Sequence, residues 1–164
     1  MIHILVTGGT IDDLDYINPP PDDFWKNHKS LIAQALEQSR LSVEYTVEEL
    51  MAKDSRFVTD SDREIILNAC KKMLEDKIVI THGTMSLPVT AKYIGRNHLS
   101  KTIVLVGSMI PLNKTTTDAF FNLGGALVAV QLLPHGVYVA MNGKIFTWDN
   151  VRKNLENGYF ETES

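Results

Sequence analysis

The chain has 164 residues, of which 44% are hydrophobic and 22% are charged. These values are typical of one globular domain, and they exclude fibrous, collagen-like and disordered proteins. The formal net charge is -4, with acidic and basic residues well mixed. Because no basic stripe is present to neutralise phosphates, we expect no nucleic-acid partner.

No apolar run approaches the roughly 20 residues that cross a bilayer, and the chain opens on a strand-like run rather than a signal-like one. We therefore expect no membrane association and no secretory signal. The single cysteine, Cys70, excludes an internal disulfide and fits a reducing compartment, so we expect a cytoplasmic protein. Cys70 lies in a helical run, where we interpret it as core packing rather than as a nucleophile.

Short β-branched runs alternate with amphipathic stretches along the chain. The runs predict strands, and the stretches between them predict helices. We expect strands at 2–7, 42–47, 77–81, 102–107, 137–141 and, more weakly, 144–147. We expect helices at about 23–40, from 61 onward, at 88–97 and at 118–133. Continuously apolar strands that alternate with helices indicate an α/β fold with three layers and a doubly wound, mainly parallel sheet.

The second predicted helix carries its own start signal. Ser61 is the expected N-cap, and Glu64 three residues later completes a capping box. The apolar residues that follow at helical spacing are expected to face the core. They are Ile65, Ile66, Ala69, Cys70 and Met73.

A proline-rich segment at 18–23 is the clearest loop in the sequence. It follows the first of two threonine-rich turns, so it could cover whatever binds there. A stiff connector into the first helix is the alternative interpretation.

One pattern, Thr-x-Gly-Thr after an apolar run, occurs at both 7–10 and 81–84. In an open parallel sheet, ligands bind beyond the carboxyl ends of the strands, where glycine permits tight turns. If the first and third strands are neighbours, the hydroxyls of Thr10 and Thr84 can face one another across a small planar group. This geometry suits attack on a carbonyl carbon.

A threonine hydroxyl is a poor nucleophile until a neighbouring base removes its proton. Lysine can serve as that base when burial lowers its pKa. Spacing alone does not choose among the candidates, which are Lys92, Lys114, Lys144 and Lys153.

Five segments in order make the sequence resemble the bacterial-type L-asparaginases, and in particular their N-terminal domain. They are "TGGTI", "ITHGTMSLPVTAKYI", "VLVGSMIP", "DAFFNLGGALVAV" and "GVYVAMNGKIFTWDNVRKN". The resemblance covers nearly the whole chain and implies a Rossmann-like asparaginase N-terminal domain over 1–164, without the C-terminal domain of full-length relatives. It further implies a homo-oligomer, either a dimer or a tetramer.

The resemblance implies an amidohydrolase that acts on the side-chain amide of L-asparagine or a related small carboxamide, with no cofactor. Thr10 matches the nucleophilic threonine and Thr84 the second active-site threonine, which Lys153 supports as a base. Tyr16 is expected to stand in for the tyrosine that activates the first threonine, although it lies nearer to Thr10 than in full-length enzymes.

Substrate contacts follow from the same resemblance. Ser55 matches a serine that binds the α-carboxylate of the substrate. Gly9 and Gly83 would bring the loop backbone close to the substrate, where main-chain N–H groups could hold the oxyanion.

Met85 is the main departure from the family pattern, which has an aspartate at this position that binds the substrate's α-amino group and orients the lysine. A thioether is a weak acceptor and cannot replace a carboxylate. Three alternatives stay open: another acid takes over, the substrate has no free α-amino group, or the site is weak or inactive. The candidate acids are Asp12, Asp13, Asp15 and Asp54.

A second departure lies after the fourth strand, where the family's arginine is replaced by Ile110, although Asp118 and Asn122 keep matching positions.

Two other classes of function compete with hydrolysis. Phosphate or nucleotide binding is disfavoured, because neither G-x-G-x-x-G nor a Walker lysine follows the first strand. The histidines show no metal-ligand spacing, so we expect no metal site, and we interpret His82 as structural. A non-catalytic module that binds an amino acid or amide on the same scaffold is the stronger alternative, and Met85 favours it.

Overall fold

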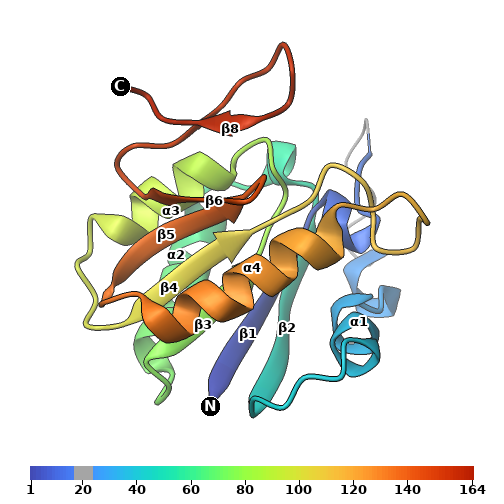
Figure 1. Ribbon diagram of the computed structural model, residues 1–164, viewed down its shortest axis with the longest axis horizontal. Coiled ribbons are helices and arrows are strands. Elements are labelled where there is room, and N and C mark those ends of the chain that lie inside the picture. Colours follow the sequence, from blue (N-terminus) through green and yellow to red (C-terminus); the bar gives the residue numbers. More distant parts are fainter. Residues whose placement is uncertain (17–23) are drawn as a thin grey trace.

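The computed structural model describes residues 1–16 and 24–164. The proline-rich segment predicted as a cover or a connector lies outside these residues. Among the described residues, six strands form one sheet in the order β2-β1-β3-β4-β5-β6 (Figure 1). The first five are parallel to their neighbours, whereas β6 is antiparallel to β5. The strands are β1 (Ile2–Gly8), β2 (Tyr45–Lys53), β3 (Lys77–Thr81), β4 (Thr102–Val106), β5 (Gly136–Met141) and β6 (Lys144–Thr147).

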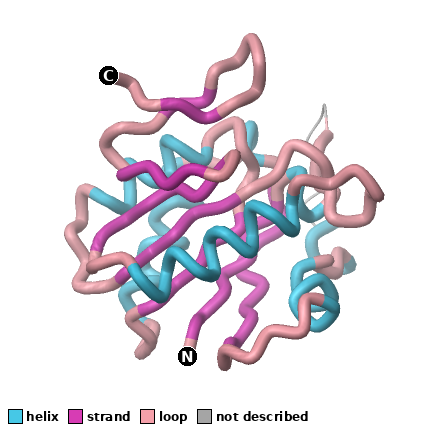
Figure 2. Tube along the Cα trace, in the orientation of Figure 1, coloured by secondary structure: helices cyan, strands magenta, loops and turns pink. Residues whose placement is uncertain are grey.

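Helices cover both faces of this sheet (Figure 2). One face packs against α1 (Ile32–Gln38) and α4 (Ala119–Leu132). The other packs against α2 (Asp60–Lys72) and α3 (Leu87–Gly95). The three-layer, mainly parallel α/β fold predicted from the sequence is confirmed.

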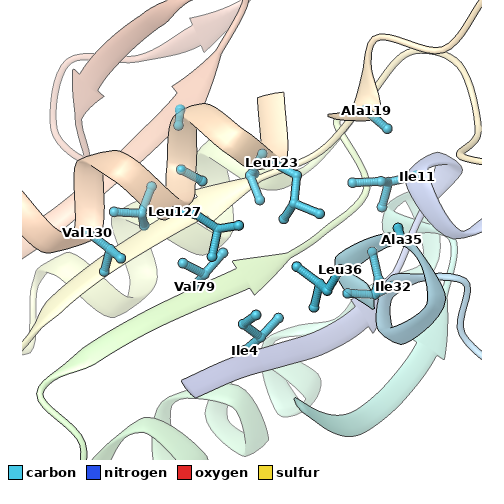
Figure 3. Packing of buried hydrophobic residues seen from close by; sticks show 14 of the residues in the cluster. Ile4, Ile11, Ile32, Ala35, Leu36, Val79, Ala119, Leu123, Leu127 and Val130 are labelled. Carbon is cyan, nitrogen blue, oxygen red and sulfur yellow. The ribbon is translucent and has the colours of Figure 1, made fainter. Parts of the chain in front are cut away.

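The strands divide their side chains between two apolar cores. In β1, Ile4 and Val6 belong to the core under α1 and α4, whereas Leu5 belongs to the core under α2 and α3. Figure 3 shows the first of these cores, where Ile4 and Val79 of the sheet lie below Leu127 of α4. Burying each such side chain contributes about 1.5 to 3 kcal/mol. The alternation explains why the central strands β3, β4 and β5 are apolar at nearly every position.

The capping box of α2 lies two residues before the predicted one. Thr59 is the N-cap: its hydroxyl accepts a hydrogen bond from the Asp62 N–H, and the Asp62 carboxylate accepts one from the Thr59 N–H at 2.8 Å. The sequence holds two overlapping signals of the same spacing, and the earlier pair forms the box. Ile65, predicted to face inward, is 50% exposed.

Two further elements differ from expectation. The first helix is shorter than predicted, because a 3-10 turn at Phe24–Asn27 precedes α1. Strand β2 extends beyond the predicted 42–47 to Lys53. It is an edge strand paired only with β1, and edge strands commonly carry charged residues such as Glu48 and Glu49.

A small hairpin completes the described fold. It consists of β7 (Arg152–Lys153) and β8 (Phe160–Glu161), which pair antiparallel (Figure 1). Sequence reasoning missed this hairpin, although the Asn157-Gly158 dipeptide between the strands is a recognised turn signal, and Gly158 has a φ of 77°. Because Lys153 lies on it, the hairpin brings this side chain to the site described next.

Candidate active site

Strands β1 and β3 are neighbours in the sheet, with Val6 opposite Thr81. The expected adjacency of the first and third strands is therefore confirmed. The loops that follow β1, β2, β3 and β4 meet at the carboxyl edge of the sheet around a cavity of about 210 Å³. This volume is below that of sites for drug-sized molecules, so the cavity suits a small metabolite. It is lined by Thr10, Asp15, Asp54, Ser55, Arg56, Gly83, Thr84, Met85, Met109 and Lys153.

Glycines let the threonine-rich turns touch. A Cβ atom placed on Gly9 would lie 2.3 Å from the Cα of Gly83, and one placed on Gly83 would lie 2.6 Å from the Cβ of Ser55. Gly9 also has a φ of 89° and a ψ of -178°, which is essentially restricted to glycine. The backbones of three loops are therefore packed closely against one another at the cavity, which Gly83 and Ser55 line.

Thr10 begins a one-turn 3-10 helix, Thr10–Asp12, directly after β1. Its half-buried side chain lines the cavity. Among the described residues, none makes a hydrogen bond to its hydroxyl group. The oxygen is thus left open toward the cavity.

Thr84 and Lys153 form the best-defined polar pair of the cavity. The Lys153 Nζ donates a hydrogen bond of 2.8 Å to the Thr84 Oγ1, although 69 positions separate them in the sequence. Thr84 is buried, and partial burial lowers the pKa of Lys153, an effect that the negative charge of Asp15 opposes. A lysine with a lowered pKa is more often neutral, and a neutral amine can accept the hydroxyl proton of Thr84.

The other candidate lysines lie away from the cavity. Lys92 forms an ion pair with Glu163, and Lys114 and Lys144 are exposed on a loop and on β6. Of the candidates from the sequence, the structure brings only Lys153 to the described cavity.

Tyr16 is held beside the cavity rather than among its lining residues. Its hydroxyl accepts a hydrogen bond of 3.2 Å from the Asp54 N–H, and its ring stacks on Phe57 with 5.3 Å between centroids. Burial raises the pKa of Tyr16, which makes its phenolate less accessible at neutral pH. Its role as activator of Thr10 stays a prediction.

Ser55 joins two of the loops. It is buried just after the end of β2; its Oγ accepts a hydrogen bond of 3.2 Å from the Ser86 N–H, and its carbonyl accepts one of 2.6 Å from the Ser86 hydroxyl. The side chain therefore both lines the cavity and fixes the entry to α3. Its contact with a substrate carboxylate stays a prediction.

The candidate acids separate clearly in the structure. Asp12 is fully buried and accepts hydrogen bonds from His28, Ser30 and the Leu31 N–H, so it anchors the segment before α1. Asp13 is exposed and accepts one from Asn113. Neither lines the cavity.

Asp15 and Asp54 do line it, together with Arg56, which sequence reasoning missed. The Arg56 guanidinium binds Asp54 through Nε at 3.1 Å and through its terminal nitrogen at 2.5 Å, and the same terminal nitrogen contacts Asp15 at 2.5 Å. Burial alone would raise the pKa of Asp54, but the hydrogen bonds from Arg56 outweigh it and lower the pKa. The position of Arg56, a charge next to Ser55 at a strand's carboxyl end, could have indicated its presence here.

Two methionines form the apolar side of the cavity. The Lys153 Nζ lies 3.5 Å from the Met85 sulfur, and the Thr84 hydroxyl lies 3.8 Å from the Met109 sulfur. Asp118 holds the Met109 loop by accepting hydrogen bonds from the N–H groups of Met109 and Ile110. The position where the family carries an aspartate thus presents a thioether to the lysine.

His82 lies within the second motif but is fully buried. Its Nδ1 and Nε2 contact the Gly83 carbonyl and the Thr90 hydroxyl, and burial lowers its pKa to about 4. A neutral, fully bonded histidine of this kind is structural. In the part of the chain that the structure describes, no cluster of three or more histidine, cysteine or acidic side chains could hold a metal, and no helix is long and apolar enough to cross a membrane.

Comparison with known protein families gives a match over nearly the whole chain. The family model described as "Asparaginase, N-terminal" matches residues 1–159. The chain belongs to the asparaginase family. The resemblance inferred from the ordered motifs is thereby confirmed for the family.

Relatives within the asparaginase family carry different names. The chain is 30% identical to a glutamyl-tRNA(Gln) amidotransferase component of Methanococcus vannielii, over 96% of this chain and 37% of that protein. It is 30% identical to L-asparaginase 2 of Bacillus subtilis, over 88% of this chain and 41% of that protein. The thermostable L-asparaginase structure from Thermococcus kodakarensis superposes with a TM-score of 0.80 and 27% identity, over 98% of this chain and 50% of that one. The chain thus spans half or less of each of these relatives.

Proposed function

We propose that this chain is an asparaginase-type amidohydrolase that converts the side-chain amide of L-asparagine, or of a related small carboxamide, to the acid and ammonia. The observation that carries the proposal is the 2.8 Å hydrogen bond between Lys153 and Thr84, in the same cavity that Thr10 lines. A hydroxyl paired with a partly buried lysine, opposite a second hydroxyl, suits acyl transfer.

In the first half of the proposed reaction, the Thr10 Oγ1 attacks the amide carbon while its proton passes to a water or to Tyr16 in its phenolate form. The negative oxygen of the tetrahedral intermediate is stabilised by main-chain N–H groups of the turns at Gly9 and Gly83. The C–N bond then breaks, the nitrogen takes up a proton, and ammonia leaves. An ester between Thr10 and the substrate acyl group remains.

In the second half, water attacks the ester carbon. Thr84 accepts a proton from this water as it passes its own to the neutral amine of Lys153. The ester bond breaks, Thr10 recovers its proton, and the acid is released. The substrate, water and the side chains named above supply every atom and proton of these two half-reactions.

The alternative is a module that binds an amino acid or amide without turnover, and the thioether of Met85 beside Lys153 favours it. Association into a dimer or tetramer and a cytoplasmic location stay predictions from the sequence. The exposed apolar side chains of α4, namely Phe121, Val128 and Leu132, are a surface that such association could cover.

A coupled ammonia assay on L-asparagine, L-glutamine and D-asparagine tests the proposal. We expect ammonia from L-asparagine. The binding module predicts instead that the melting temperature rises while no ammonia forms. A ligand at about 100 times its Kd stabilises the native state by about 2.7 kcal/mol, which is a rise of roughly 5 to 10 °C for a domain of this size. That outcome would overturn hydrolysis in favour of binding.

Replacing Met85 by aspartate tests whether a carboxylate is missing from the site. Because Met85 lines the cavity at the position where the family resemblance implies an aspartate that binds the α-amino group, we expect Met85→Asp to favour substrates with an α-ammonium group. A charge-assisted hydrogen bond is worth about 1.5 to 3 kcal/mol, so KM for L-asparagine should fall by roughly 10-fold or more. KM for succinamic acid, the same amide without the amino group, should not fall. Met85→Leu is the uncharged control, and an equal change for both amides would contradict the prediction.

A further inference from the structure

Among the described residues, three charged side chains line the cavity beside that of Lys153. The loop after β1 contributes Asp15, and the loop after β2 contributes Asp54 and Arg56. The loops after β3 and β4 contribute Thr84, Met85 and Met109, none of which is charged. On the hairpin itself, Glu161 pairs with Arg152 at 2.6 Å.

Arg56 neutralises Asp54 but not both acids. Its Nε and terminal nitrogen engage both oxygens of Asp54, whose side chain is only 6% exposed. Asp15 shares a single contact with the same guanidinium and keeps a side chain that is 63% exposed. Two carboxylates therefore share one guanidinium, and the negative charge left over lies with Asp15.

Arg56 also fixes the position of the Asp15 carboxylate. Its terminal nitrogen donates to Asp15 at 2.5 Å and to the carbonyl of Tyr16 at 2.6 Å, so it ties the loop after β1 to the loop after β2. In the described part of the chain, no carboxylate lies within ion-pair distance of the Lys153 Nζ. The charge of Asp15 nevertheless raises the pKa of Lys153, against the larger effect of burial.

We propose that Asp15, anchored by Arg56, is a positioning residue that controls the charge state of Lys153 and hence the pH range in which the site releases ammonia. The inference rests on the function proposed above. Asp15 supplies the negative charge near Lys153 that the thioether of Met85 cannot supply, and it acts through space without a hydrogen bond to the lysine. Of the candidate acids, Asp12 and Asp13 lie outside the cavity and Asp54 is already neutralised.

The direction in which the pH profile should move follows from the negative charge of Asp15. Lys153 must be neutral to take the proton of Thr84, so the rate rises with pH through the pKa of Lys153. Asp15→Asn removes a negative charge that favours the ammonium form, so the pKa of Lys153 falls and the rising limb moves to lower pH. A near opposite charge shifts a pKa by about 1 to 3 units. Because Asp15 is exposed, solvent screens part of its charge, so we expect a small but measurable displacement of the limb to lower pH.

The experiment compares pH profiles of ammonia release for the full chain and three variants. Asp15→Asn should move the rising limb of the pH profile to lower pH. Asp15→Glu, which keeps the negative charge, should leave the limb where it is in the unmodified chain. Asp13→Asn is the matched control: it makes the same change two residues away, outside the cavity, and should leave the limb in place. Salt at about 1 M, which screens exposed charges, should shift the unmodified chain toward the Asp15→Asn profile and leave that variant unchanged.

A measurement that needs no turnover separates the inference from the proposed function. The ¹⁵Nζ resonance of Lys153, assigned with Lys153→Met, reports its titration directly by NMR. A lower midpoint in Asp15→Asn than in the unmodified chain supports the inference even if no amide releases ammonia, in which case hydrolysis alone has failed. Identical midpoints in the two proteins would overturn the inference, whether or not ammonia is released.

Discussion

Thr10→Val is expected to abolish ammonia release from L-asparagine while leaving the fold intact. Valine nearly keeps the shape of threonine but has no oxygen to attack the amide carbon. Removing the nucleophile of a hydrolase that forms a covalent intermediate lowers kcat on the order of 10⁴- to 10⁶-fold. Thr10 is half-buried, and no described residue bonds to its hydroxyl, so the melting temperature should hardly change.

Two controls make this result specific. Thr10→Ser keeps a hydroxyl and should keep measurable turnover. Thr116→Val makes the same chemical change on an exposed loop and should leave kcat unchanged. Ammonia release that survived in Thr10→Val would remove Thr10 from the mechanism. A matching loss of melting temperature would instead assign the residue a role in stability.

Gly9→Ala should cost more stability than any surface substitution. The new Cβ would lie 2.3 Å from the Gly83 Cα, and the backbone conformation of Gly9 costs other residues about 1 to 3 kcal/mol. Since the three nearest atoms, the Gly83 Cα and N and the His82 C, all belong to the backbone, no side chain can move to relieve the overlap. We expect a loss of at least about 3 kcal/mol, or roughly 6 to 12 °C in melting temperature for a domain of this size.

Gly124→Ala is the matched control for this prediction. Gly124 lies inside α4, exposed, with no heavy atom within 4 Å of a new Cβ. Alanine in a helix interior is favoured over glycine by about 0.5 to 1 kcal/mol, so the melting temperature should rise slightly. If the melting temperatures of Gly9→Ala and Gly124→Ala were the same, the backbone contact between Gly9 and Gly83 would not exclude a side chain at position 9.

The fold could be predicted from the sequence because its central strands β3, β4 and β5 are short and largely apolar. The limits of β3 and β6 agree with the predicted 77–81 and 144–147. Errors occur where local signals compete. Thr59 and Ser61 both offer a capping pattern, and only packing of the rest of α2 decides between them. Strand β2 was predicted too short because its polar half lies at the sheet edge.

The site was harder to predict, since its contacts join distant segments. Adjacent ends of parallel strands indicated that Thr10 and Thr84 line one cavity. No local pattern links Thr84 to Lys153, which arrives on a hairpin that the sequence reasoning missed, so that pair followed only from the family resemblance. Arg56 was overlooked because a single arginine after a strand is usually a surface group, and its role depends on two acids from different loops.

The contact between Gly9 and Gly83 has a consequence for how this scaffold can diversify. At this contact main chain packs against main chain, so neither glycine has a side chain to exchange. Selection for a different ligand therefore acts on the side chains that line the cavity, among them Met85, Met109 and Asp15. The glycine contact can persist unchanged while those side chains are replaced.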